Sequence, residues 1–179
     1  MSFDFSFPAG SETFSNDGPR SYEQELFENE EYKFKLLEVS DETKEIGGME
    51  CRSCYFAAYD EEGLNELARF YCSLRLPSNY DTVPSDKHWM IQKDMRVWQA
   101  LVTCYNTENH LEQSYSVEDL KQLEGCMIMG KVRPRSYTNK TGGTSWGYSI
   151  IYPRPFTQND QREAFENAKK ELLNDDIPF

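Results

Sequence analysis

Alternating apolar and polar side chains run through most of this chain, and a single long helical pattern interrupts them. Within 68–76 the apolar residues, among them Phe70 and Leu74, take every second position. A period of two indicates a strand with one buried face. From about Lys87 to Asn106 the apolar residues return at three- and four-residue steps instead, which indicates an amphipathic helix. The chain is therefore expected to be mainly β, with a helix in its middle.

The order of the expected elements narrows the fold further. We expect strands at 32–39, 49–59, 68–76, 125–135 and 146–152, and a short helix at 158–173. Gly47-Gly48 and the stretch Lys140–Thr144 are turn signals that close two hairpins. Three strands, a helix and two strands is the order of an OB-fold, a partly open five-stranded Greek-key barrel. The sequence thus predicts an OB-fold-like barrel with a helix between strands 3 and 4, a short C-terminal helix and an acidic tail.

This organisation divides the chain into four parts. They are an acidic and aromatic N-terminal arm at 1–31, the barrel domain at 32–156, the C-terminal helix at 157–173 and an acidic tip at 174–179. Phe3, Phe5 and Phe7 alternate within the arm. They would form a short strand that adds to the domain or to a neighbour, or else a loosely held arm. The pattern leaves both readings open.

Charge is distributed unevenly along the chain. The formal net charge of −12 is unusual for a nucleic-acid-binding protein, since such domains are generally basic. However, residues 1–31 hold eight acids against one base, whereas residues 121–159 hold six bases against Glu124 alone. The net charge of the whole chain therefore masks a basic segment in its middle, and much of that basic charge lies on one predicted hairpin. A charge run is often just a solvated face, but this clustering favours an anion-binding surface.

Basic and aromatic residues gather on the elements that an OB-fold uses for oligonucleotides. Binding of single strands without sequence preference needs cations for phosphates and exposed rings for bases. The candidate DNA-binding residues are Arg52 on the second strand, Arg69, Tyr71 and Arg75 on the third, Lys131, Arg133 and Arg135 on the fourth, Tyr137 and Lys140 in the following loop, and Trp146 and Tyr148 on the fifth. The other reading is that Trp146, Tyr148 and Tyr152 form the inward face of the fifth strand.

The last five residues carry a second signal. Asp175 and Asp176 precede Ile177, Pro178 and Phe179, so two acids, a stiff turn and a ring stand against the terminal carboxylate. A hydrophobic pocket with a basic rim would accept this tip, in the carboxylate-capture mode of peptide recognition. The tip resembles that of bacterial single-stranded DNA-binding proteins. The resemblance implies that these five residues recruit replication, recombination and repair enzymes.

A further resemblance covers roughly residues 26–106. The stretch Glu30–Val39, then Gly47-Gly48-Met49 and then Trp98 within a helix is similar to small bacteriophage proteins of the single-stranded DNA-binding type. This implies an OB-fold that binds and protects single-stranded DNA during phage DNA replication and recombination. It also implies a location in the bacterial host cytoplasm. A homo-oligomer stays open.

Several other functional classes find no support in the sequence. No nucleophile elbow, phosphate loop or paired-carboxylate motif is present, so we expect no enzyme activity and no cofactor. Cys51 and Cys54 have the spacing of half a zinc site, but no second pair exists, and we expect no metal and ordinary reduced thiols. No apolar run reaches the length of a membrane span, so a cytoplasmic protein with no membrane partner is expected.

Two other readings differ in class. An adaptor or decoy would use the tip to dock on host DNA-metabolism enzymes and would bind little DNA itself, which the overall acidity favours. An accessory subunit or nuclease of a recombination system is the third reading, permitted by the many acids but supported by no metal-site spacing. Trp89 and Trp98 are both expected in the core rather than at a ligand.

Overall fold

The computed structural model describes residues 18–109 and 117–156. The helix expected at 157–173, the tip at 174–179 and the phenylalanines at 3, 5, 7 and 14 lie outside this range. The elements are β1 (Tyr32–Ile46), β2 (Met49–Tyr59), β3 (Glu66–Arg75), α1 (His88–Asn109), β4 (Met127–Thr138) and β5 (Thr144–Pro155), with short 3-10 turns at Pro77–Asp81, Ser85–Lys87 and Val117–Leu123. The predicted order of three strands, a helix and two strands is confirmed.

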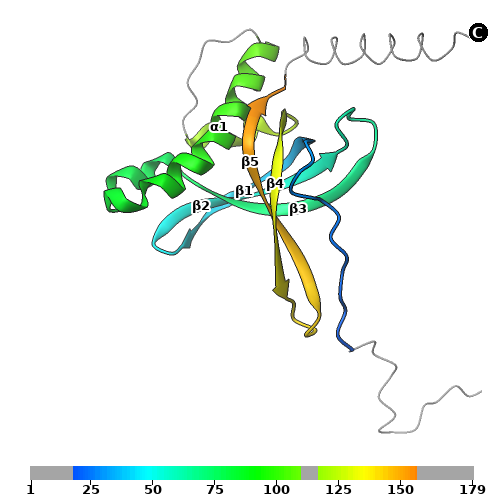
Figure 1. Cartoon of the computed structure of the whole chain (residues 1–179). Helices are drawn as coiled ribbons and strands as arrows, with labels where there is room; N and C mark the ends of the chain where they lie inside the picture. The colour runs from blue at the N-terminus through cyan, green and yellow to red at the C-terminus, as the bar shows by residue number, and fades with distance from the viewer. Residues whose placement is uncertain (1–17, 110–116, 157–179) are drawn as a thin grey trace, which may run out of the picture.

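All five strands belong to one antiparallel sheet in the order β3-β2-β1-β4-β5 (Figure 1). The sheet curls, so that its two edge strands approach through their inner faces: the rings of Phe70 on β3 and Tyr148 on β5 lie 5.6 Å apart at their centroids. Within the described residues no ladder of hydrogen bonds joins β3 to β5. The sheet is therefore open, and the expected barrel is not formed by strand pairing.

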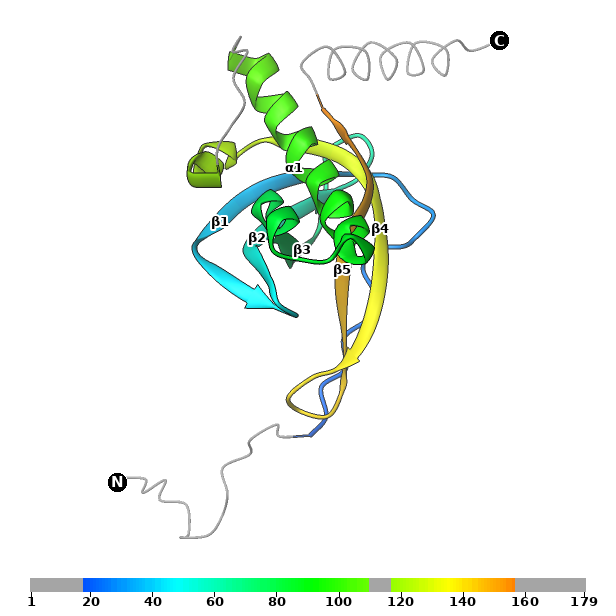
Figure 2. The same ribbon diagram turned by 90° about the vertical axis from the view of Figure 1, so that its left-hand side faces the viewer.

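The core fills the inside of the curl. Phe34, Leu36, Phe56 and Leu101 are fully buried there, as the alternating and helical patterns predict. Helix α1 lies against the curled sheet and contributes Trp98, whose indole Nε1 donates to the Arg75 carbonyl at 3.0 Å. Figure 2 shows α1 between the β1–β2 hairpin and the β4–β5 hairpin.

The two tryptophans of α1 differ in burial. Trp98 is 5% exposed and belongs to the core, as expected, but Trp89 is 59% exposed and the prediction for it is wrong. Trp89 stands in the first turn of α1, directly after His88, where the helix begins. The apolar stripe of the helix becomes buried from Ile91 onward, so a ring one residue from the helix start faces solvent.

The first strand is longer than its pattern suggested. β1 continues to Ile46, seven residues beyond the predicted end at Val39, and pairs with β2 up to Met49. The pairing register shifts between Val39 and Thr43, which marks a bulge, and the residues beyond it are exposed. The hairpin is closed by Gly47 and Gly48, with φ of 60° and 78°. Strand pairing, rather than burial, stabilises this extension, so its sequence has no alternation of apolar and polar residues from which it could be predicted.

An N-terminal segment packs along the β4–β5 hairpin in both views (Figures 1 and 2). The backbone amide of Tyr22 donates to the Thr144 carbonyl at 2.8 Å, and Asn139 Nδ2 donates to the Arg20 carbonyl at 2.6 Å. Leu26 is fully buried in the core cluster. Residues 20–26 are therefore held by the same domain as the strands.

In the described part of the chain, no helix combines the length and apolar character needed to cross a bilayer.

Candidate nucleic-acid interface

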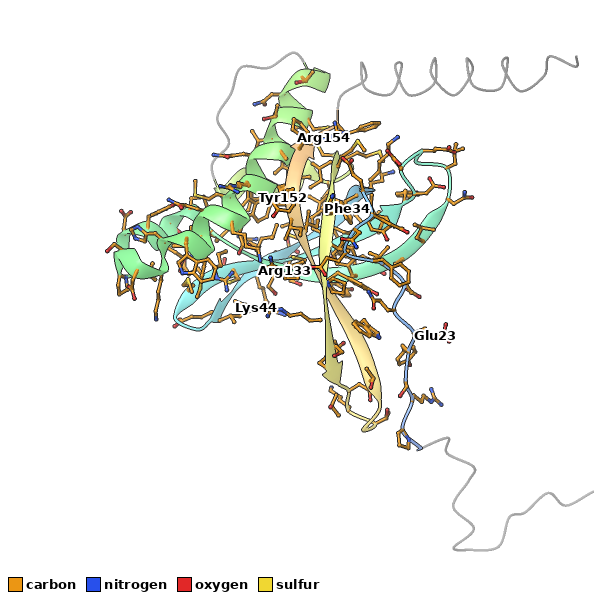
Figure 3. All side chains as sticks on the ribbon, in the orientation of Figure 1. Glu23, Phe34, Lys44, Arg133, Tyr152 and Arg154 are labelled. Carbon is orange, nitrogen blue, oxygen red and sulfur yellow. The ribbon has the colours of Figure 1, made fainter. Side chains whose placement is uncertain are left out.

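Four cations converge where α1 meets the end of β3 and the middle of β4. They are Arg75, Lys93, Arg133 and Arg135, and we call them the basic cluster. The pKa of Lys93 is lowered, first by burial and then by the charge of Arg133; the Asp94 carboxylate opposes this shift, and Arg135 and Arg75 add to it. Figure 3 shows Arg133 where β4 leaves the body of the sheet for the projecting hairpin. The sheet and helix therefore hold like charges together, at an electrostatic cost that a bound anion would offset.

Arg75 of the basic cluster pairs with an acid inside the domain. Its guanidinium Nη1 and its backbone amide donate to Asp94 Oδ2 at 3.0 and 2.9 Å. Burial raises the pKa of Asp94, and the two Arg75 contacts oppose this shift. Arg75 thus links β3 to α1, so this predicted DNA-binding residue has a structural role. Because Arg75 engages Asp94, this acid neutralises less of the positive charge of Lys93, Arg133 and Arg135.

Two tyrosines form an open stacked pair on the other side of the sheet from the core. Tyr55 of β2 and Tyr71 of β3 stand directly opposite each other in the register, with ring centroids 4.4 Å apart and planes 22° apart. Tyr71 is 69% exposed. The Arg69 guanidinium pairs with Glu66 and also contacts the Tyr55 hydroxyl. We call Tyr55 and Tyr71 the tyrosine platform; a flat exposed ring next to a cation can stack a nucleobase.

The hairpin presents some of its predicted residues and buries others. Tyr137 is 56% exposed and Lys140 is exposed at the tip, while Lys131 is half-buried on β4. Trp146 is half-buried and packs against the core, as the inward reading of β5 allowed. Tyr148 is 7% exposed, and its hydroxyl accepts from the amides of Glu25 and Leu26. Tyr148 therefore belongs to the core and cannot stack on a base.

Arg52 is also placed differently from its predicted role. Its Nη1 donates to the Ser40 carbonyl at 2.6 Å, inside the bulge of β1, and its Nε is buried without a hydrogen bond. The side chain is half-buried and braces the bend of the β1–β2 hairpin. Among the eleven predicted residues, Arg75, Arg133 and Arg135 thus lie at one place, and Arg69 and Tyr71 lie at another. Arg52 and Tyr148 instead make contacts that hold the fold together.

Sequence reasoning missed three residues at these two places. Lys93 lies on the polar side of a helix, and only the packing of α1 against β4 brings it to the arginines. Tyr55 had a usable signal, since it lies one position from buried Cys54 and Phe56 on a predicted strand and so faces outward. Lys35 of β1 lies across Ala57 from Arg69 in the register. The partner-binding residues 175–179 lie outside the described residues.

The cysteines are ordinary thiols in this structure. Cys51, Cys54, Cys104 and Cys126 are buried and Cys72 is half-buried, which is the burial predicted for ordinary thiols. Burial raises the pKa of the Cys54 thiol well above its usual range. Within residues 18–109 and 117–156, no three His, Cys, Asp or Glu side chains gather as a metal site would require.

No protein-family model matches the chain, and a search of curated proteins finds no match either.

Proposed function

We propose that this protein binds single-stranded DNA with little sequence preference and protects it during DNA replication and recombination. The observation that carries the proposal is the basic cluster, in which Lys93 of α1 lies close enough to Arg133 and Arg135 of β4 for their charges to lower its pKa. Keeping cations together costs stability unless a partner supplies negative charge. A phosphate backbone supplies that charge at regular spacing and releases counterions as it binds.

The tyrosine platform supports a single strand over a duplex. Its exposed face offers a ring to a base, and the bases of a duplex are already stacked on one another. Stacking is worth about 1–3 kcal/mol per base and tolerates every base, because each has a π-face. An exposed ring and an exposed cation near the end of the hairpin, Tyr137 and Lys140, extend the same chemistry.

Fold and tail complete the proposal. The strand order β3-β2-β1-β4-β5, with the inner faces of β3 and β5 meeting at Phe70 and Tyr148, is compatible with an OB-fold barrel whose last edge is not paired. In this proposal the tip Asp175–Phe179 recruits partner enzymes, as its resemblance to the bacterial tips implies. The role is that of a phage-type single-stranded DNA-binding protein in the host cytoplasm, without enzymatic activity of its own.

The test is fluorescence anisotropy of a labelled oligo-dT titrated with the full chain at several salt concentrations. We expect binding that weakens with salt and that unlabelled duplex competes poorly. The double variant Arg133→Gln/Arg135→Gln should bind more weakly, and its slope of log K against log salt should fall in magnitude by about 1.4, since each phosphate contact on a single strand contributes about 0.7.

The matched control is Arg154→Gln, which removes one exposed cation at the far end of the same hairpin, where Arg154 pairs with Glu31. This variant should bind like the parent. No binding of oligo-dT at low salt, by the full chain or by a chain shortened before residue 174, would overturn the proposal and favour an adaptor that acts through its tip alone.

A further inference from the structure

We propose that Trp89 of α1 stacks on a nucleobase next to the basic cluster, so that the helix forms part of the single-strand site together with β4. This inference rests on the proposed binding of single strands and adds a contact from the helix to it. The sequence predicts this ring in the core, and the fold instead leaves it 59% exposed. An exposed indole offers a wide π-face to a flat ligand.

Trp89 lies on a side of α1 that carries positive charge. Lys93 and Arg96 follow it four and seven positions later, and residues with this spacing share one side of a helix. We call these three residues the helix face. Asp94 is the sole acid in the sequence from 88 to 103, and it is buried and paired on the other side of the helix. In a protein with a net charge of −12, a helix face without an acid suits an anionic ligand.

Lys93 connects the helix face to the arginines of β4. Burial lowers its pKa first, and the charges of Arg133 and Arg135 lower it further, so the three cations lie within electrostatic range of one another. Side chains of a helix lean toward its N-terminus, so Lys93 extends over the turn that holds Trp89. A phosphate bound between Lys93 and Arg133, which Figure 3 labels, therefore leaves the base of the same nucleotide one helical turn away, at the indole.

The first turn of α1 is held in place by its neighbours, although the ends of helices commonly fray. His88 Nε2 lies 3.2 Å from the Val83 carbonyl oxygen, and the His88 ring meets the ring of Tyr80 edge to face, with centroids 4.5 Å apart. Tyr80 belongs to the 3-10 turn Pro77–Asp81, which precedes the helix. A ring on a fixed turn loses little conformational entropy when a base stacks on it.

The indole of Trp89 is open to a ligand. Among the residues that the structure describes, none stacks a ring on it or accepts a hydrogen bond from its Nε1, whereas the Nε1 of Trp98 donates to the Arg75 carbonyl. Single exposed apolar side chains are common and need no partner. Trp89 differs because the next turn of the helix face belongs to the basic cluster. Stacking on its ring would tolerate any base, since every base has a π-face.

The experiment follows tryptophan fluorescence while the full chain is titrated with oligo-dT. Trp89 is exposed, Trp146 is half-buried and Trp98 is buried, so a base that stacks on Trp89 should quench the emission of the most accessible indole. We expect quenching on binding by the parent, and we expect most of it to be lost in Trp89→Phe. This variant should still bind oligo-dT, because phenylalanine keeps a ring on which a base can stack.

Affinity gives a second readout. Trp89→Ala should bind oligo-dT about tenfold more weakly, near the lower end of the value of one stacked base. Its slope of log K against log salt should equal that of the parent, because the indole contacts no phosphate. An oligomer of the same length with an abasic site in place of every thymine should bind the parent and Trp89→Ala equally. Because the ring is largely exposed, thermal unfolding of the two proteins should agree.

Phe27→Ala is the matched control, since it removes a ring that is 49% exposed from an acidic stretch of the chain, between Glu25 and Glu28. This variant should bind oligo-dT like the parent. Quenching that persists in Trp89→Phe, or an unchanged affinity of Trp89→Ala, overturns the stack at Trp89, while the binding of oligo-dT still supports the proposed function. If oligo-dT binds at no salt concentration, the proposed function and the stack fail together.

Discussion

The hydroxyl of Tyr148 on β5 accepts a hydrogen bond from the backbone amide of Glu25 at 2.9 Å, across 123 residues of chain. The next amide, that of Leu26, points at the same oxygen at 3.3 Å. This contact anchors the N-terminal segment to the core and removes Tyr148 from any binding surface. It also shows that residues before β1 are part of the domain's packing.

The close approach of this segment to the hairpin tip predicts a strong effect at Gly143. A Cβ at this position would overlap the Arg20 carbonyl oxygen, and backbone atoms cannot rotate away as a side chain would. We expect Gly143→Ala to displace residues 20–22 and to lower the free energy of unfolding by about 1–3 kcal/mol. Thermal unfolding measures the loss, and faster tryptic cleavage after Arg20 locates it.

Gly147→Ala on the same hairpin is the control for that substitution. Its added Cβ would meet the nearest atom, Tyr137 Cε1, at an ordinary 3.8 Å. This variant should unfold like the parent. Equal effects of the two alanines would contradict the role given to the Arg20 contact.

The charge of Lys93 should lower the stability of the free protein and strengthen the binding of DNA. Because burial and the nearby arginines lower its pKa, removing its charge relieves a cost in the free protein. We expect Lys93→Met to raise the free energy of unfolding by a few tenths to about 1 kcal/mol and to weaken the binding of oligo-dT. Lys87→Met, an exposed cation just before α1, should change neither quantity appreciably. A destabilised Lys93→Met variant would argue that the cation is structural.

The tyrosine platform predicts a loss of affinity without a loss of stability. Tyr71 is 69% exposed, so truncating it removes little from the fold. Tyr71→Ala should weaken the binding of oligo-dT by about 1–3 kcal/mol, the worth of one stacked base, while Tyr71→Phe should retain it. Tyr152→Ala removes a ring of nearly the same exposure, 71%, from β5 and should bind normally. A similar loss in both alanine variants would exclude a specific stack at Tyr71.

The raised pKa of Tyr32 predicts that the free energy of unfolding falls at alkaline pH. Burial, together with the Glu30 carboxylate to which its hydroxyl donates, raises its pKa from 10.0 to about 12. Between these values the unfolded chain loses the proton that the folded chain keeps, so the free energy of unfolding falls as pH rises from 10 toward 12. Tyr32→Phe lacks this titration. At neutral pH it should be about 1–2 kcal/mol less stable, because the Phe27 amide loses its acceptor.

The gap between the two proteins should therefore narrow above pH 10, as chemical denaturation at a series of pH values would show. A gap that stays constant from pH 7 to pH 11 would contradict the raised pKa.

Elements with one buried face could be predicted from the sequence, and elements held by other forces could not. The alternation of β3 and the helical period of α1 placed Phe70, Leu74 and Trp98 correctly in the core. The extension of β1 to Ile46 carries no such period, because pairing with β2 stabilises it without burial. Trp89 was misplaced because a period says which side a ring faces but not whether the neighbouring element reaches it.

Among the candidate binding residues, the sequence by itself determined the charge and the ring. Arg133, Arg135 and Tyr71 are on outward positions of predicted strands, and they are exposed. Only the tertiary structure decided which residues have other partners. Arg75 is bound by Asp94, Arg52 by Ser40 and Tyr148 by the N-terminal segment, all through contacts between residues distant in the chain.

The same division holds for the residues that meet from different elements. Strand period determined that Tyr55 and Tyr71 face outward, but the register of β2 against β3 made them a stack. The packing of α1 against β4 brought Lys93 to the arginines. A local period reports the direction of each side chain from its own backbone. The distance between side chains on separate elements depends on pairing and packing across the whole domain, which no local period encodes.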